Sequence, residues 1–229
     1  MPEISPALYR AGEGEPLVLI HGFTATWRCW LPVLAELVPR FEVIAPTLHG
    51  HDGGGELPPR DAPHDIAQAT DFLERHLDEL GVDTAHFVGN SLGGALALEL
   101  AKRGRARSVV GISPAGGLRP GDERSARQII RVFTRMQTMT TRSIDVLPRI
   151  VKRPRLRQLA FRDVMARGHL VPPAEALALA RSSVRCDIVE DVYEVLRRGD
   201  AALHDLDQVR VPTLIVWGDR DRILPIDVH

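Results

Sequence analysis

The chain has 229 residues, and its 29 Lys and Arg against 30 Asp and Glu leave a formal net charge of −1. The balanced charge gives no excess of basic residues for binding nucleic acid. The sequence also contains no uninterrupted apolar run of about 18 residues, the length that a membrane span needs. The N-terminus also lacks the apolar segment of a secretion signal. The only cysteines, Cys29 and Cys186, predict free thiols and a cytoplasmic protein.

The predicted elements alternate along the first half of the chain. Short apolar segments predict buried strands at residues 16–22, 41–45, 85–88, 108–113 and 212–217. Helical spacing of apolar residues predicts helices at residues 27–38, 62–80 and 95–103. Gly81 fits the position just after the end of the second helix. This alternation predicts an α/β fold with a mostly parallel central sheet and helices on both faces.

The alternation stops after residue 117, where only helical patterns follow until about residue 200. We expect this stretch to be a helical lid inserted between two strands, above the carboxyl ends of the sheet. The predicted organisation is a core over residues 1–117, a lid over 118–201, and the core continued over 202–229.

The most informative segment is residues 85–94, Ala-His-Phe-Val-Gly-Asn-Ser-Leu-Gly-Gly. A strand runs into Gly89-Asn90-Ser91-Leu92-Gly93 and a helix follows at once, which is the setting of the G-x-S-x-G nucleophile elbow. Ser91 must sit on a sharp, strained turn so that its hydroxyl projects above the sheet. Glycine at positions 89 and 93 allows the strand and the helix to approach closely. The pattern therefore predicts Ser91 as a nucleophile.

Two further landmarks accompany the elbow: His21-Gly22-Phe23 after the first buried strand and Trp217-Gly218-Asp219-Arg220-Asp221 after the last. From about residue 16 to residue 225, the chain resembles the lidded serine hydrolases of the α/β-hydrolase family. The resemblance implies an oxyanion hole made by the backbone N–H groups of Phe23 and Leu92. Residues 46–51 are similar to the family's Leu-Pro-Gly-His loop, with His49 in the proline position.

The resemblance also implies a triad acid and a triad base. The Gly-x-x-Asp pattern selects Asp221 over Asp219 as the acid. The family places its histidine after one more strand, whereas the sequence ends at His229, so the last strand and the triad histidine are expected to be missing. Either the chain is truncated, or it is a shortened protein that lost its base. Without an imidazole to take its proton, Ser91 is a poor nucleophile at neutral pH.

The other histidines are weak substitutes for that base. We expect His21 to be part of the oxyanion turn and His51 to brace its own loop. A minor alternative is that a lid histidine or His229 reaches Ser91. The remaining candidates are expected on solvated or remote surface: His64, His76 and His86.

The expected lid is strongly basic. Between residues 119 and 167, only Asp122, Glu123, Asp145 and Asp163 oppose the basic side chains. These are Arg119, Arg124, Arg127, Arg131, Arg135, Arg142, Arg149, Lys152, Arg153, Arg155, Arg157, Arg162 and Arg167. One interpretation is that these side chains attract anionic substrates or an anionic surface. The other is that they form a solvated face, on which the aliphatic parts of the side chains cover apolar surface. Residues 171–180, rich in Leu, Val and Ala, are expected to supply an apolar acyl pocket.

Together these features predict a serine hydrolase that cleaves a small ester, a lactone or an activated C–C bond, impaired by the absent histidine. Serine at the elbow argues against epoxide hydrolases and haloalkane dehalogenases, which use aspartate there. The alternatives are a non-catalytic binding module and an acyltransferase or perhydrolase on the same site. No metal or cofactor is expected, and the partner is a small-molecule substrate. An exposed edge strand at residues 213–217 predicts self-association.

Overall fold

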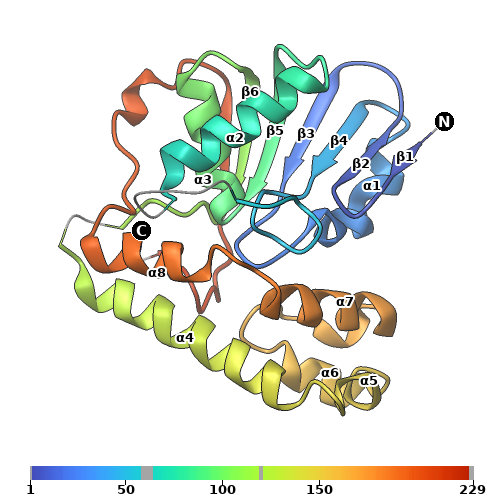
Figure 1. Cartoon of the computed structure of the whole chain (residues 1–229). Helices are drawn as coiled ribbons and strands as arrows, with labels where there is room; N and C mark the ends of the chain where they lie inside the picture. The colour runs from blue at the N-terminus through green and yellow to red at the C-terminus, as the bar shows by residue number, and fades with distance from the viewer. Residues whose placement is uncertain (1, 58–63, 119–120, 227–229) are drawn as a thin grey trace.

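A computed structural model describes residues 2–57, 64–118 and 121–226. Its centre is a seven-stranded sheet in the order β1-β2-β4-β3-β5-β6-β7 (Figure 1). The strands are β1 Glu3–Ile4, β2 Leu8–Ala11, β3 Pro16–Ile20, β4 Glu42–Pro46, β5 Ala85–Asn90, β6 Ala106–Ile112 and β7 Thr213–Val216. From β4 to β7 the neighbours pair in parallel, whereas β1 and β2 add an antiparallel edge that the sequence did not reveal. The predicted mostly parallel sheet is confirmed.

Helices cover both faces of this sheet because alternate strand residues point to opposite sides. Val18 and Ile20 of β3 face α2 (Ile66–Glu79) and α3 (Leu92–Lys102). Leu17 and Leu19 face the other layer, formed by η1 (Trp27–Trp30) and α1 (Leu31–Leu37). The doubly covered β3 is therefore fully apolar, as its sequence predicted.

Local signals fix where α2 begins and ends. The Asp65 carboxylate accepts a hydrogen bond from the Gln68 backbone N–H at 2.8 Å, and the Gln68 side chain accepts one from the Asp65 N–H. This capping box starts the helix later than the predicted residue 62, which lies outside the described residues. Gly81 then ends it with a φ of 74°.

A helical insertion separates β6 from β7 in sequence. It contains α4 (Glu123–Arg142), α5 (Leu147–Ile150), α6 (Pro154–Ala160), η2 (Gly168–Leu170), α7 (Pro173–Val184) and α8 (Val189–Arg198), before η3 (Leu206–Gln208) leads into β7. Figure 1 shows α8 and α4 below the carboxyl ends of the strands, with α5 and α6 farthest from the sheet.

Within the described part of the chain, no helix is both long and apolar enough to cross a membrane. Both cysteines are free thiols. Burial raises the pKa of Cys29 and of Cys186 to about 12, so both are protonated and unreactive near neutral pH.

Candidate active site

Ser91 sits on a strained turn between β5 and α3. Its φ of 52° and ψ of −116° are unfavourable for any residue but glycine. The surrounding backbone holds it there: the Ser91 N–H donates to Ile112 O at 3.0 Å, and Ser91 O accepts from the Ala115 N–H at 2.9 Å. The ends of β6 and the following loop thus fix the backbone that carries the hydroxyl.

Glycine is required on either side of this turn. A Cβ at Gly89 would lie 2.1 Å from Gly93 O, and one at Gly93 would lie 2.2 Å from Ile20 O. Real side chains do not approach backbone oxygens so closely, so the strand–turn–helix can form only with hydrogen at both positions. The predicted spacing of the elbow has this steric cause.

The His21-Gly22-Phe23 turn lies directly against the elbow, because a Cβ on Gly22 would be 3.2 Å from the Ser91 Cβ. The His21 ring braces the turn from within the core. Its Nε2 accepts a hydrogen bond from the Leu48 N–H at 2.9 Å, so Nδ1 carries the proton and donates to Gly22 O at 2.9 Å. Burial, with a smaller effect of His51, holds the pKa of His21 well below its ordinary value. His21 is therefore neutral and structural, as expected.

The backbone N–H groups of Phe23 and Leu92 both lack a hydrogen-bond acceptor among the described residues. Leu92 is the first residue of α3, where a helix leaves its N–H groups unsatisfied. The Phe23 ring contacts Phe133 of α4 edge to face, at 4.8 Å between centroids. The next residue, Thr24, accepts a hydrogen bond from Ser182 Oγ of α7 at 3.1 Å. The turn that carries one of the two N–H groups is thus held by the insertion.

Asp221 and Asp219 differ sharply in their surroundings. Asp221 Oδ1 accepts hydrogen bonds from the N–H groups of Ile223 and Leu224, both at 2.9 Å. The side chain of Asp219 is 91% exposed. Ile223 and Leu224 line the same cavity as Ser91, so the loop after β7 fixes Asp221 next to that cavity and leaves Asp219 in solvent.

The cavity above Ser91 is open at one side; its space, open solvent included, amounts to about 1160 Å³, and its wall is largely apolar. Phe23 and Leu92 contribute from the core. The insertion contributes Ile129, Phe133, Ile188, Val192, Val195 and Leu196. The expected acyl pocket from residues 171–180 is wrong, because Ala176 and Ala180 pack instead on Leu147 and Val151. In Figure 1, α7 lies to the side of α8 and above α5 and α6, so its alanine face meets those helices.

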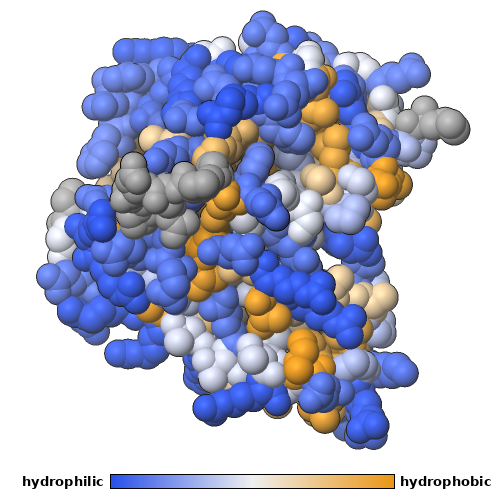
Figure 2. All heavy atoms as spheres, in the orientation of Figure 1, coloured by the Kyte–Doolittle hydropathy of each residue, from blue (hydrophilic) through white to orange (hydrophobic). Residues whose placement is uncertain are grey.

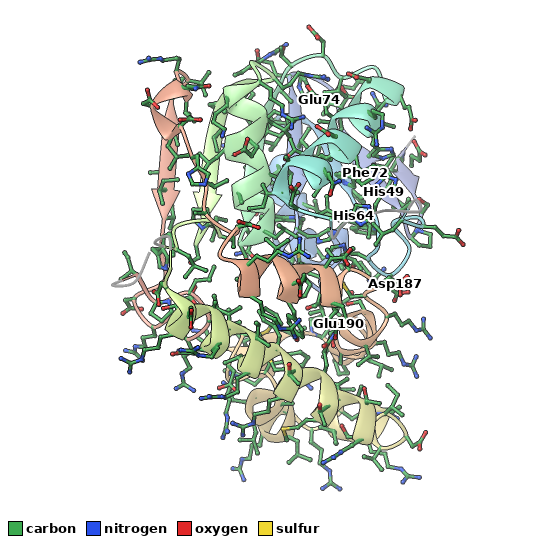
Figure 3. All side chains as sticks on the ribbon, turned by 60° about the vertical axis from the view of Figure 1, so that its left-hand side comes forward. His49, His64, Phe72, Glu74, Asp187 and Glu190 are labelled. Carbon is green, nitrogen blue, oxygen red and sulfur yellow. The ribbon has the colours of Figure 1, made fainter. Side chains whose placement is uncertain are left out.

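His64 is not on solvated surface, contrary to expectation. It is 8% exposed, lines the cavity, and places Nδ1 3.0 Å from Oδ2 of Asp191, which is 1% exposed. In Figure 3, His64 lies near His49 and near Phe72 of α2, whose ring centroid is 5.4 Å from that of His64. The pair joins the start of α2 to α8. One signal was available in the sequence, since Asp191 falls four residues before Val195 on the apolar stripe of α8.

A second cavity histidine, His51, is also buried. Its Nδ1 donates to His49 O at 3.1 Å, as a residue that braces its own loop would, and its ring meets His21 at 4.8 Å. Its Nε2 is buried with no hydrogen-bond partner in the described chain. Burial lowers the pKa of His51 to about 4. Among the described residues, no imidazole is hydrogen bonded to the Ser91 hydroxyl, and His229 lies outside them.

Comparisons with known proteins agree with this arrangement. The model of the alpha/beta hydrolase family matches residues 17–228. The epoxide hydrolase EphH of Mycobacterium tuberculosis is 34% identical over 161 residues, which cover 69% of this chain and 73% of that protein. The 2-hydroxymuconate semialdehyde hydrolase of a Pseudomonas species is 38% identical over 114 residues, covering 48% of this chain and 40% of that one.

A similar solved structure is the enol-lactonase of Burkholderia xenovorans LB400. It superposes with a TM-score of 0.67 at 22% identity, over 96% of this chain and 80% of that chain. The likeness extends over both the sheet and the helical insertion of the present chain.

Proposed function

The chain belongs to the alpha/beta hydrolase family and is an enzyme of the hydrolase type, and on that premise we propose a serine hydrolase of esters, lactones or activated C–C bonds. The observation that carries the proposal is the strained backbone of Ser91. This residue lines an apolar cavity and lies beside two N–H groups that have no acceptor among the described residues. Strain of this kind persists only where the surrounding structure enforces it.

The chemistry proceeds through an acyl-enzyme. Ser91 Oγ loses its proton to a base and attacks the substrate carbonyl carbon. The carbonyl oxygen takes up the electron pair as an oxyanion and accepts hydrogen bonds from the N–H groups of Phe23 and Leu92. Collapse of this intermediate re-forms the carbonyl and breaks the bond to the leaving group, an alcohol oxygen or a carbon, which takes up the proton that the base received from Ser91. Water then hydrolyses the acyl ester, which releases the acid and restores Ser91.

Serine also argues for carbonyl substrates over epoxides, although one relative is named an epoxide hydrolase. A carboxylate that opens an epoxide forms an ester, which water can attack at its carbonyl. A serine would form an ether, which has no carbonyl for the second step. With Ser91 as nucleophile, an epoxide would therefore block the enzyme after one turnover.

Asp221 is the proposed acid of the site. Two backbone N–H groups fix one of its carboxylate oxygens, so the other is free to orient a triad imidazole, which none of the described residues supplies, and to stabilise its charged form. The insertion acts as a lid, since its apolar side chains form much of the cavity wall. An apolar acyl group fits this wall best.

A fluorophosphonate probe tests the nucleophile, because it reacts only with an activated serine. We expect the probe on the tryptic peptide that contains Ser91, and no probe in Ser91→Ala. Ser113→Ala is the matched control, since Ser113 also has a positive φ (42°) at the end of the adjacent strand. Retention of label in Ser91→Ala would overturn the proposal. No label on this chain or on a longer gene product would favour a non-catalytic binding module, whereas label that appears only on the longer product would show that the base of Ser91 comes from outside residues 1–229.

The proposed partners are a small-molecule substrate and a second copy of the chain, which pairs with the exposed strand 213–217. The two free thiols support a reducing, cytoplasmic location.

A further inference from the structure

The far end of the insertion combines exposed apolar side chains with unpaired cations. We call residues 152–170 the insertion tip; it comprises α6, η2 and the turn between them. Six of its residues are Lys or Arg and only Asp163 is acidic. Four of its large aliphatic side chains are exposed: Leu156 (38%), Leu159 (58%), Val164 (38%) and Leu170 (64%).

Arg157 makes the insertion tip one compact unit. Its side chain is buried, and its guanidinium donates to Val151 O and, at 2.6 Å, to His169 O. Gly168 packs so tightly that a Cβ there would be 2.8 Å from the Phe161 Cβ. Leu170 is therefore held on the same body as Leu156 and Leu159. The exposed apolar side chains are presented by a fixed scaffold.

The cations of the insertion tip are available for an external partner. Among the described residues, Lys152, Arg153, Arg155 and Arg167 form no ion pair. Asp163 is already engaged, by Arg222 at 3.3 Å and Arg162 at 3.8 Å. The solvated-face interpretation of the basic run explains these charges, but it leaves the exposed Leu and Val side chains between them unexplained.

We propose that the insertion tip docks on the surface of an anionic lipid membrane. Aliphatic side chains interspersed with Lys and Arg are typical of segments that lie in a membrane interface. There the aliphatic side chains insert at the boundary between headgroups and acyl chains, and the cations contact lipid phosphates. A protein partner fits less well, because protein interfaces separate an apolar centre, depleted of charge, from a polar rim. Figure 2 shows hydrophobic residues among hydrophilic ones at the lower right, where Figure 1 places α5 and α6.

The docking site is separate from the candidate active site. Residues 152–170 are absent from the described lining of the cavity, to which the insertion contributes from its segments 118–133 and 188–201. The inference concerns binding and goes beyond the proposed function. Its test reads lipid binding alone and does not depend on the chemistry at Ser91.

Vesicle sedimentation tests the proposal with the full chain. We expect binding to vesicles that contain about one third phosphatidylglycerol in phosphatidylcholine, at least about tenfold tighter than to phosphatidylcholine alone. Raising the salt to about 1 M should remove this preference, because it shortens the Debye length to about 3 Å. Equal binding to neutral and anionic vesicles, or no binding to either, would overturn the proposal.

Two double variants separate the charge from the apolar contribution. Arg153→Gln with Arg155→Gln should weaken binding to anionic vesicles by about thirtyfold, since each cation near the surface contributes about fivefold. Leu156→Ser with Leu159→Ser should weaken it by at least about tenfold. The matched controls are Arg124→Gln with Arg131→Gln, exposed on α4, and Val33→Ser with Leu206→Ser, exposed elsewhere.

The controls should bind as the unchanged chain does, and circular dichroism should show that every variant is folded. Equal losses in the control variants would contradict the assignment to the insertion tip. So would a variant of the tip that changes the oligomeric state and leaves vesicle binding unaltered, because it would identify a contact between proteins.

Discussion

At the scale of single residues, Ser91 is placed by its neighbours against its own backbone preference. The hydrogen bonds to Ile112 and Ala115, and the close packing at Gly89 and Gly93, hold a φ of 52° that serine adopts only at a cost. A structure that stores strain at its reactive group gains stability when the strain is relieved.

We predict that Ser91→Gly raises the free energy of unfolding by about 1 kcal/mol, because relief of strain exceeds the added entropy of the unfolded chain. Urea unfolding measures the change. Ser91→Ala, which keeps a Cβ at the same φ, serves as the control and should be no more stable than the unchanged chain. A destabilised Ser91→Gly would show that the elbow is not strained.

His51 gives the protein a defined dependence on pH. Its pKa falls from about 6.5 in the unfolded chain to about 4 in the fold, because burial disfavours the charged ring. The neutral form therefore contributes stability above pH 6.5. This stability is lost as the pH falls towards 4, since the unfolded state binds the proton more readily. His21, lowered by the same cause, acts in the same direction.

We expect His51 to account for a loss of about 3 kcal/mol between about pH 7 and pH 4. Urea unfolding at several pH values should give a shallower profile for His51→Gln than for the unchanged chain. The comparison rests on the slopes and not on the absolute stability of the variant. Parallel profiles would contradict the assignment of this dependence to His51.

At the scale of elements, the His64–Asp191 pair connects the start of α2 to α8. It is the point where a core helix and the insertion meet through buried polar groups, beside the cavity. Both side chains are nearly inaccessible to water, so their interaction is little screened. The pair therefore couples the position of the insertion to the sheet.

A double-mutant cycle with His64→Gln and Asp191→Asn should give a coupling energy of about 1–3 kcal/mol in urea unfolding. The matched control is the exposed pair of Glu123 and Arg127 on α4, whose side chains are 73% and 67% exposed. Its cycle should give no more than about 0.5 kcal/mol. Equal coupling in the two cycles would mean that the buried pair does not hold the insertion.

At the scale of the whole molecule, the sheet ends in an apolar edge strand. In β7, Leu214 is 57% exposed, and Ile215 and Val216 are each 45% exposed. Exposed edges of this kind offer unpaired backbone groups to other chains.

We predict that the chain self-associates through β7, with a sedimentation coefficient that rises with concentration. Leu214→Lys should leave it monomeric, because charge on an edge strand opposes pairing. Leu206→Lys places the same charge on an exposed apolar residue outside the sheet and should not change the association. A chain that stays monomeric at all concentrations would refute the prediction.

The sequence by itself determined the parallel strands, the helices of the core and the elbow, because these depend on short-range periodicity and on glycine at fixed positions. Only the tertiary structure decided what meets in space. The cavity wall is formed by α4 and α8 and not by residues 171–180. His64 is buried against Asp191, which lies 127 positions later in the sequence. Contacts between distant segments depend on how helices stack on the sheet, and local patterns carry no record of that packing.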